Sequence, residues 1–113
     1  MPVEYIAHPI TANIRNETGA RAINVLYTNN TLRPIQVVIT MTHRVTVQNS
    51  FCLSQLTIGL LATAWGGWYN TPAVGIELYS CITGNIAPGA TYRLTQNAAG
   101  GVNTILRWIE VDQ

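Results

Sequence analysis

Two histidines, His8 and His43, are the side chains best suited to acid–base chemistry near neutral pH. Nucleophilic catalysis needs such a base beside a serine, cysteine or threonine. His8 falls in the N-terminal segment, and His43 shares the parity of the apolar residues Met41 and Val45 along one predicted strand. That position is typical of a histidine in a core or a subunit interface, and no acidic residue nearby in the sequence would orient it. We expect His43 to be structural.

Carboxylates are the other candidates for chemistry, as the paired acids of a glycoside hydrolase. Only Glu77 lies away from the terminal segments, so nothing in the spacing predicts a pair. Metal sites need clusters of histidine, cysteine or carboxylate at ligand spacing, and this chain has single residues. We predict no enzymatic activity, no metal and no cofactor. The carboxylates are Glu4, Glu17, Glu77, Glu110 and Asp112.

The aromatic residues Trp65, Trp68 and Tyr69 surround two adjacent glycines in a segment, residues 64–72, that we expect to be a loop. Tryptophan and tyrosine combine a large apolar area with a polar edge, so they dominate binding hot spots and stack on sugars. In the alternative, the tryptophans fold back into their own core. Both interpretations stay open, and these three residues are binding candidates.

The chain has too few charges to cover its own surface. Charged residues make up 10% of its 113 residues and hydrophobic residues 48%, against about 25% charged residues in an ordinary soluble domain. A monomer of this size normally carries more charge on its exterior. We therefore expect part of the exterior to be buried by other subunits, in a homo-oligomer that is a trimer or a dimer.

All six basic residues are arginines, spread along a chain of net charge +1. Arginine forms planar, weakly hydrated contacts that suit protein interfaces, and Arg33 and Arg44 are candidates for this role. Nucleic-acid binding needs a basic cluster, often with aromatic residues between the charges. Because the arginines form no cluster, we predict no nucleic-acid partner.

The N-terminal sequence has no basic segment followed by an apolar run, which predicts synthesis in a cytoplasm without a secretory signal. The uncharged residues 56–69 are too short and too rich in glycine to cross a bilayer, so we expect no membrane partner. In a reducing compartment Cys52 and Cys81 should remain thiols. The alternative is a disulfide between them.

Alternating apolar and polar residues predict an all-β protein. The longest alternation starts at Ile35, where odd positions through Val47 are mostly apolar and even positions are polar, as in a half-buried antiparallel strand. Gly59 suggests a bulge or a close crossing, Gly84 with Asn85 a turn, and residues 97–101 a loop. No helical periodicity is present. About seven short strands are expected, at residues 3–7, 20–28, 35–48, 51–62, 74–82, 90–95 and 102–111.

Four residues have predicted structural roles. Pro34 opens the long strand, where a missing N–H costs no ladder hydrogen bond. Pro88 and Gly89 should form positions i+1 and i+2 of a type II turn, because glycine accepts the positive φ required there. Trp108 should fill the core in the last strand, with Glu110 either exposed or paired to an arginine.

Three stretches carry a family resemblance: AINVLYTNNTLRPIQV at residues 22–37, IAPGATY at 86–92 and LRWIEV at 106–111. Together they resemble the small all-β module that ends many bacteriophage tail fibres and tailspikes and recurs in other virion proteins. The resemblance covers about the last 90 residues. It implies a β-sandwich, and the position of Arg33 is often basic in such modules.

The expected architecture is an antiparallel β-sandwich of jelly-roll-like topology over residues 20–113, preceded by an extended N-terminal arm over residues 1–19. The expected function is that of a phage virion protein made in the bacterial cytoplasm. We favour a capsid decoration or cement protein that binds the major capsid protein or another virion protein, because the chain has no shaft repeat, coiled coil or anchoring domain. The alternatives are a fibre tip that recognises host glycan and a carbohydrate-binding module outside any phage.

Overall fold

The computed structural model describes residues 13–71 and 74–113, apart from the side chains of residues 63–64 and 68–71. Strands dominate this part of the chain, and none of it is helical. The all-β prediction is therefore confirmed. The strands are β1 (Ile14–Asn16), β2 (Tyr27–Thr28), β3 (Ile35–Val45), β4 (Ser50–Ile58), β5 (Leu61–Thr71), β6 (Glu77–Ile86), β7 (Thr91–Ala99) and β8 (Gly101–Asp112).

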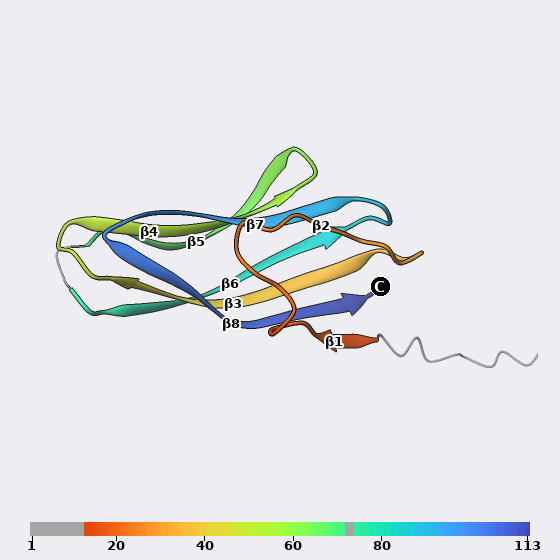
Figure 1. The fold of residues 1–113 in the computed structure, drawn as a ribbon, viewed down its shortest axis with the longest axis horizontal. Coiled ribbons are helices and arrows are strands. Elements are labelled where there is room, and N and C mark those ends of the chain that lie inside the picture. The colour runs from red at the N-terminus through yellow and green to blue at the C-terminus, as the bar shows by residue number, and fades with distance from the viewer. Residues whose placement is uncertain (1–12, 72–73) are drawn as a thin grey trace, which may run out of the picture.

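The strands form two four-stranded antiparallel sheets that pack face to face as a β-sandwich (Figure 1). Sheet A has the order β1-β8-β3-β6, and sheet B has the order β2-β7-β4-β5. Strands β5 and β6 lie beside each other across the two sheets and close one side. On the other side, the outermost strands are the short β1 and β2. Strand β1 pairs with one end of β8, and β2 pairs with one end of β7. The jelly-roll topology stays a prediction.

The long alternating segment forms β3 at the centre of sheet A. Its odd residues, from Ile35 to Val45, are buried between the sheets, as the two-residue period predicts. Residues from both sheets complete the core, including Leu56 and Leu94 from sheet B. Trp108 of β8 is fully buried in this core, which confirms its predicted role. Its ring lies 6.5 Å from Tyr92 and 6.0 Å from Tyr27 between ring centroids.

The predicted turn at Pro88 and Gly89 is present. Gly89 has a φ of 78°, and the Ala90 N–H donates to the Ala87 carbonyl at 3.0 Å, as a type II turn requires. The Gly89 N–H also donates to the Asn29 carbonyl at 2.8 Å, which ties the turn to the segment before β3. Pro34 is exposed immediately before β3, in agreement with its predicted place at a strand start.

Residues 20–28, expected to be a strand, contribute only β2 to a sheet. This segment leaves the edge of sheet A after β1 and crosses to the edge of sheet B (Figure 1). The crossing requires a change of direction at Asn24, where φ is 66°. The strand prediction was wrong because the segment crosses from one sheet to the other, with Ile23 and Tyr27 packed against the core between them.

Three glycine-rich segments predicted as loops or turns belong to strands. Residues 64–72 were expected to be a loop, but β5 continues to Thr71 and pairs with β4. Gly84 lies inside β6, where a side chain would collide with Leu56 and Ile58 of the opposite sheet. The expected loop at 97–101 is a tight connection, because β7 runs to Ala99 and β8 begins at Gly101. These glycines provide space for close packing between sheets and strands.

Residues 51–62 were expected to form one strand with a bulge at Gly59, but they contain a hairpin turn. Strand β4 ends at Ile58, Gly59 has a φ of 60°, and β5 begins at Leu61. Residues 14–16, which the sequence places in the arm, form β1 beside β8. The predicted strand at 3–7 lies outside the described residues.

Replacing Gly89 by valine should lower the free energy of unfolding by about 1–2 kcal/mol, because a β-branched residue is strained at positive φ. The matched control is Gly19→Val, since a Cβ meets no atom within 4 Å at either glycine and only Gly89 has the positive φ. Chemical denaturation of both variants measures the difference. Equal midpoints for the two variants would contradict the strained-turn account.

Candidate functional site

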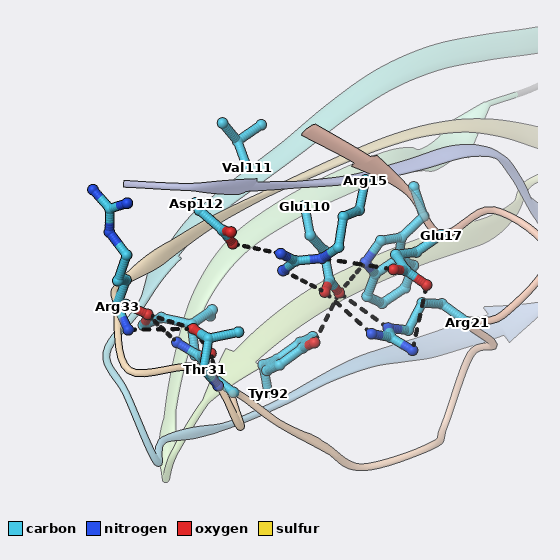
Figure 2. A network of polar contacts seen from close by, with 12 residues as sticks. Arg15, Glu17, Arg21, Thr31, Arg33, Tyr92, Glu110, Val111 and Asp112 are labelled. Carbon is cyan, nitrogen blue, oxygen red and sulfur yellow. Dashed lines mark hydrogen bonds and ion pairs between the residues drawn. The ribbon is translucent and has the colours of Figure 1, made fainter. Parts of the chain in front are cut away.

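The most elaborate polar site is built around the carboxylate of Glu110 on β8, which lies between the two sheets and is 2% exposed (Figure 2). Arg21 donates to both of its oxygens, from Nε at 3.0 Å and from Nη2 at 3.1 Å. The Tyr92 hydroxyl of β7 donates at 2.7 Å, and the Trp108 indole nitrogen donates at 3.0 Å. One carboxylate therefore joins sheet A, sheet B and the crossing segment.

Arg15 and Arg21 connect this carboxylate to two further acids (Figure 2). Arg15 of β1 pairs with Asp112 at 2.5 Å and lies 3.7 Å from Glu17. Arg21 lies 3.8 Å from Glu17 and stacks its guanidinium 4.6 Å from the centre of the Tyr27 ring. We call these five charged residues, Arg15, Glu17, Arg21, Glu110 and Asp112, the clamp.

The environment stabilises the ionised form of Glu110. Burial alone would raise the pKa of its carboxyl, but hydrogen bonds from Arg21, Tyr92 and Trp108 and the charge of Arg21 together lower it. The same bond to Glu110 raises the pKa of Arg21 above its ordinary value. Burial, followed by the bond to the Glu110 carboxylate, raises the pKa of the Tyr92 hydroxyl. At neutral pH the pair is therefore Glu110 carboxylate and Arg21 guanidinium.

A cavity of about 290 Å³ lies against the clamp, lined by Arg15, Arg21, Tyr92, Glu110 and the residues from Thr28 to Thr31. The charged groups that face it are already bonded to one another. A buried carboxylate with several donors is satisfied, so it has little tendency to bind a further ligand. We assign the clamp to holding residues 14–28 on the sandwich.

A second polar cluster surrounds His43 of β3, which is fully buried. Its Nδ1 lies 2.6 Å from Asn103 Oδ1 and its Nε2 lies 2.5 Å from Ser80 Oγ, an order of groups that resembles a catalytic triad. The backbone of β5 lies over the serine, since a Cβ at Gly66 would be 2.4 Å from Ser80 Oγ. Asn103 also donates to the Leu53 carbonyl of sheet B at 3.0 Å. This cluster connects the sheets, and the prediction that His43 is a satisfied core residue is confirmed.

The outward face of sheet A, which we call the A face, is poor in charge. Alternation along β3, β6 and β8 places Thr40, Cys81 and Arg107 in one row across it, and Thr42, Tyr79 and Thr104 in the next. Tyr79 is 64% exposed. Among the outward register positions of these three strands, charge is confined to Arg107 and, at one end, Arg44 and Glu77. The other outward residues are Gln36, Val38, Thr83, Asn85, Val102, Ile109 and Val111.

The predicted binding residues lie in different places. Arg44 lies at one end of the A face, where it helps to line an open cavity of about 540 Å³ with Glu77 and Val102. Arg33 is exposed before β3, and its carbonyl accepts from Asn29 and Thr31. Trp65 is 60% exposed on the outward face of sheet B, so the structure does not bring these three residues together.

Trp68 and Tyr69 belong to β5, and their side chains lie outside the described residues. Cys52 is buried and Cys81 is exposed, and both remain thiols, as predicted. The described residues contain no group of three histidine, cysteine or acidic side chains that could hold a metal ion. No helix in this part of the chain is long and apolar enough to cross a membrane.

No sequence pattern identified Arg15, Arg21 and Tyr92 as partners of Glu110. Of the two alternatives predicted for Glu110, pairing with an arginine is confirmed, and the carboxylate is buried rather than exposed. The partner could not be named from the sequence, because Arg21 and Glu110 are 89 residues apart. One sequence signal for this ion-pair network is that the charged residues of this charge-poor chain are concentrated near its two ends.

No protein-family model matches this chain, and no curated protein matches it.

Replacing Glu110 by glutamine should lower the free energy of unfolding at pH 7 by about 2–3 kcal/mol, because it removes the buried charge that accepts from Tyr92 and Trp108 and pairs with the partly buried Arg21. A lowered folded-state pKa stabilises the protein above the unfolded value of about 4.3, and this stabilisation is lost as the pH falls through the folded-state pKa. The wild type should therefore lose more stability than the variant on acidification below about pH 4.

The control is Asp112→Asn, which breaks a more exposed pair with Arg15 and should cost about 1 kcal/mol or less. Denaturant titrations from pH 3 to pH 7 measure all three proteins. Equal losses of unfolding free energy for the two variants at pH 7 would contradict the claim that Glu110 is the central group of the clamp. Parallel profiles of stability against pH for the wild type and Glu110→Gln would contradict it as well.

Proposed function

We propose that this protein is a non-enzymatic virion protein that decorates a phage capsid, self-associates and docks through the A face. The observation that carries the proposal is the chemistry of that face: it is one side of a regular sheet, and hydroxyl, amide and apolar side chains occupy most of it. Docking such a face requires little desolvation of charge, which is the most expensive part of burying a protein surface. A lattice of capsid subunits presents a protein surface large enough to cover the A face.

The N-terminal arm enters the fold beside the same face. Strand β1 pairs with β8 at the edge of sheet A, and Ile14 on its outward side is 66% exposed. Residue 13, where the described chain begins, therefore lies at the edge of the sheet that forms the docking surface. An arm and one face used together can bury on the order of 1,000 Å², which specific interfaces need.

The phage assignment rests on the resemblance of residues 22–37, 86–92 and 106–111 to virion modules. The proposed partners are further copies of the chain, as a trimer or a dimer, and the major capsid protein or another virion protein. The proposed location is the virion. The clamp supports self-association, because its charged residues pair with one another within the molecule. Few charges are then left for the exterior, and a charge-poor exterior favours burial by other subunits.

The outward face of sheet B favours a second candidate function, a receptor-binding module for host glycan. Trp65 lies in one register row with Gln55 and Thr95, so an exposed indole stands beside an amide and a hydroxyl. Sugars bind to such surfaces by stacking on the aromatic ring while polar groups bind their hydroxyls. This face is opposite the A face, so the two candidates can be separated by mutation.

Tyr79→Glu should weaken binding to capsids assembled without this protein by at least tenfold, because it places a charge at an exposed position of the docking surface on β6. The matched control is Asn97→Glu, which adds the same charge at an exposed position on the outward face of sheet B. Cosedimentation with capsids measures the apparent Kd and the saturating number of copies. The wild type should saturate at a fixed number per lattice element and raise the capsid melting temperature.

Equal binding by the two variants would exclude the A face as the docking surface. Failure of the wild type to bind capsids, together with glycan-array binding that Trp65→Ala abolishes, would replace the decoration function by receptor binding.

A further inference from the structure

One edge of sheet A is open along half of its longest strand. Strand β8 pairs with β3 from end to end, but on its other side β1 lies opposite Ile109–Val111 only. Backbone contacts extend this pairing to Trp108, whose carbonyl accepts from the Glu17 N–H at 2.8 Å. Within the described part of the chain, no strand lies beside residues 101–107 of β8 on this side.

This open edge lacks the lysine and the proline that protect many sheet edges, and its one irregularity is a bulge at Leu106, where β8 has an extra residue opposite β3. Natural edge strands are shortened, kept charged by lysine, or interrupted by proline. The chain contains no lysine, and residues 101–107 contain no proline and a single charge, Arg107. Val102 and Leu106 are 52% and 46% exposed beside the edge. The open main chain, which is regular over residues 101–105, and its apolar neighbours are suited to bind an added strand.

The N-terminal segment has the sequence of such a strand. Residues 3–8 form an uninterrupted stretch between Pro2 and Pro9, so each of them has a backbone N–H to donate. Val3, Tyr5 and Ala7 share one parity and would lie on one face of a strand. Six residues extend about 20 Å, which is close to the length of the open edge.

A segment of the same copy cannot reach this edge in that register. The Asp112 N–H donates to the Asn13 carbonyl at 3.1 Å, so the chain enters at the C-terminal end of β8. From there, residue 8 would have to reverse direction and return past β1 to Arg107. The five residue-to-residue steps from 8 to 13 extend about 17 Å, which equals the distance along β8 from Asp112 to Arg107 and leaves nothing for the reversal.

We propose that residues 3–8 of one copy add to sheet A of a second copy as a strand beside residues 101–107 of β8. The inference rests on the proposed self-association and gives it an interface. The added strand satisfies the open backbone groups and covers Val102 and Leu106. Reciprocal exchange closes the assembly in a dimer, and sequential exchange around a three-fold axis closes it in a trimer.

Deleting residues 2–12 and substituting Tyr5→Pro should each convert the oligomer to a monomer at micromolar concentration, by light scattering. Tyr5→Phe is the matched control and should leave the oligomer intact, because it keeps the N–H and the ring. In the wild type and the control, amides of residues 101–107 should exchange with solvent at least tenfold more slowly than in the deletion variant. Exchange in β3 and β4 should not differ, since the deletion removes nothing from their pairing.

Cross-linking tests the location directly in a Cys81→Ser background. A copy with Ala7→Cys mixed with a copy with Thr104→Cys should form a mixed disulfide, whereas mixing with Asn97→Cys should not. An oligomer that survives the arm deletion with unchanged exchange at 101–107 would overturn the exchange of arms and leave self-association in place. A wild type that is monomeric at all concentrations would overturn both, and capsid binding through the A face would still be tested by Tyr79→Glu.

Discussion

The arrangement of residues 14–28 depends on one buried carboxylate. Glu110 lies inside the sandwich, where an isolated charge would be very unfavourable. Its oxygens accept from Arg21, Tyr92 and Trp108, which come from the crossing segment, from sheet B and from β8 itself. Such a network is stabilising only when each member has its partners, because removing one leaves the others buried and unpaired. The crossing segment is therefore held at one position on the sandwich.

This internal use of charge determines what the exterior can do. The chain has six basic and five acidic residues, and the clamp alone uses Arg15, Glu17, Arg21, Glu110 and Asp112. Few charges remain for the surface, and the A face is correspondingly poor in charged residues. The clamp also fixes β1 at the C-terminal end of β8, which leaves the rest of that edge open. The proposed docking face and the proposed strand exchange are both consequences of where the clamp holds the chain.

Local patterns predicted the features that depend on local physics. The alternation from Ile35 identified β3, Pro88 and Gly89 identified a turn, and the position of Trp108 identified a core residue. Features that depend on distant contacts were missed. Gly84 indicated a turn by its type, but it lies in a strand because Leu56 and Ile58 of the other sheet need its space. Likewise, the sequence offered an arginine partner for Glu110, and only the crossing of residues 20–28 shows that it is Arg21.

Native-state hydrogen exchange of the Glu110→Gln variant tests the clamp most directly. The account predicts that the amides of Glu17 and Asn24, which bond to Trp108 and Leu94 across the segment, exchange much faster than in the wild type. The amides of Ile39 and Leu56 in the centres of the two sheets should keep most of their relative protection. If Glu17 and Asn24 kept their protection while the whole sandwich lost stability uniformly, the carboxylate would be an ordinary core contact and the central claim would be wrong.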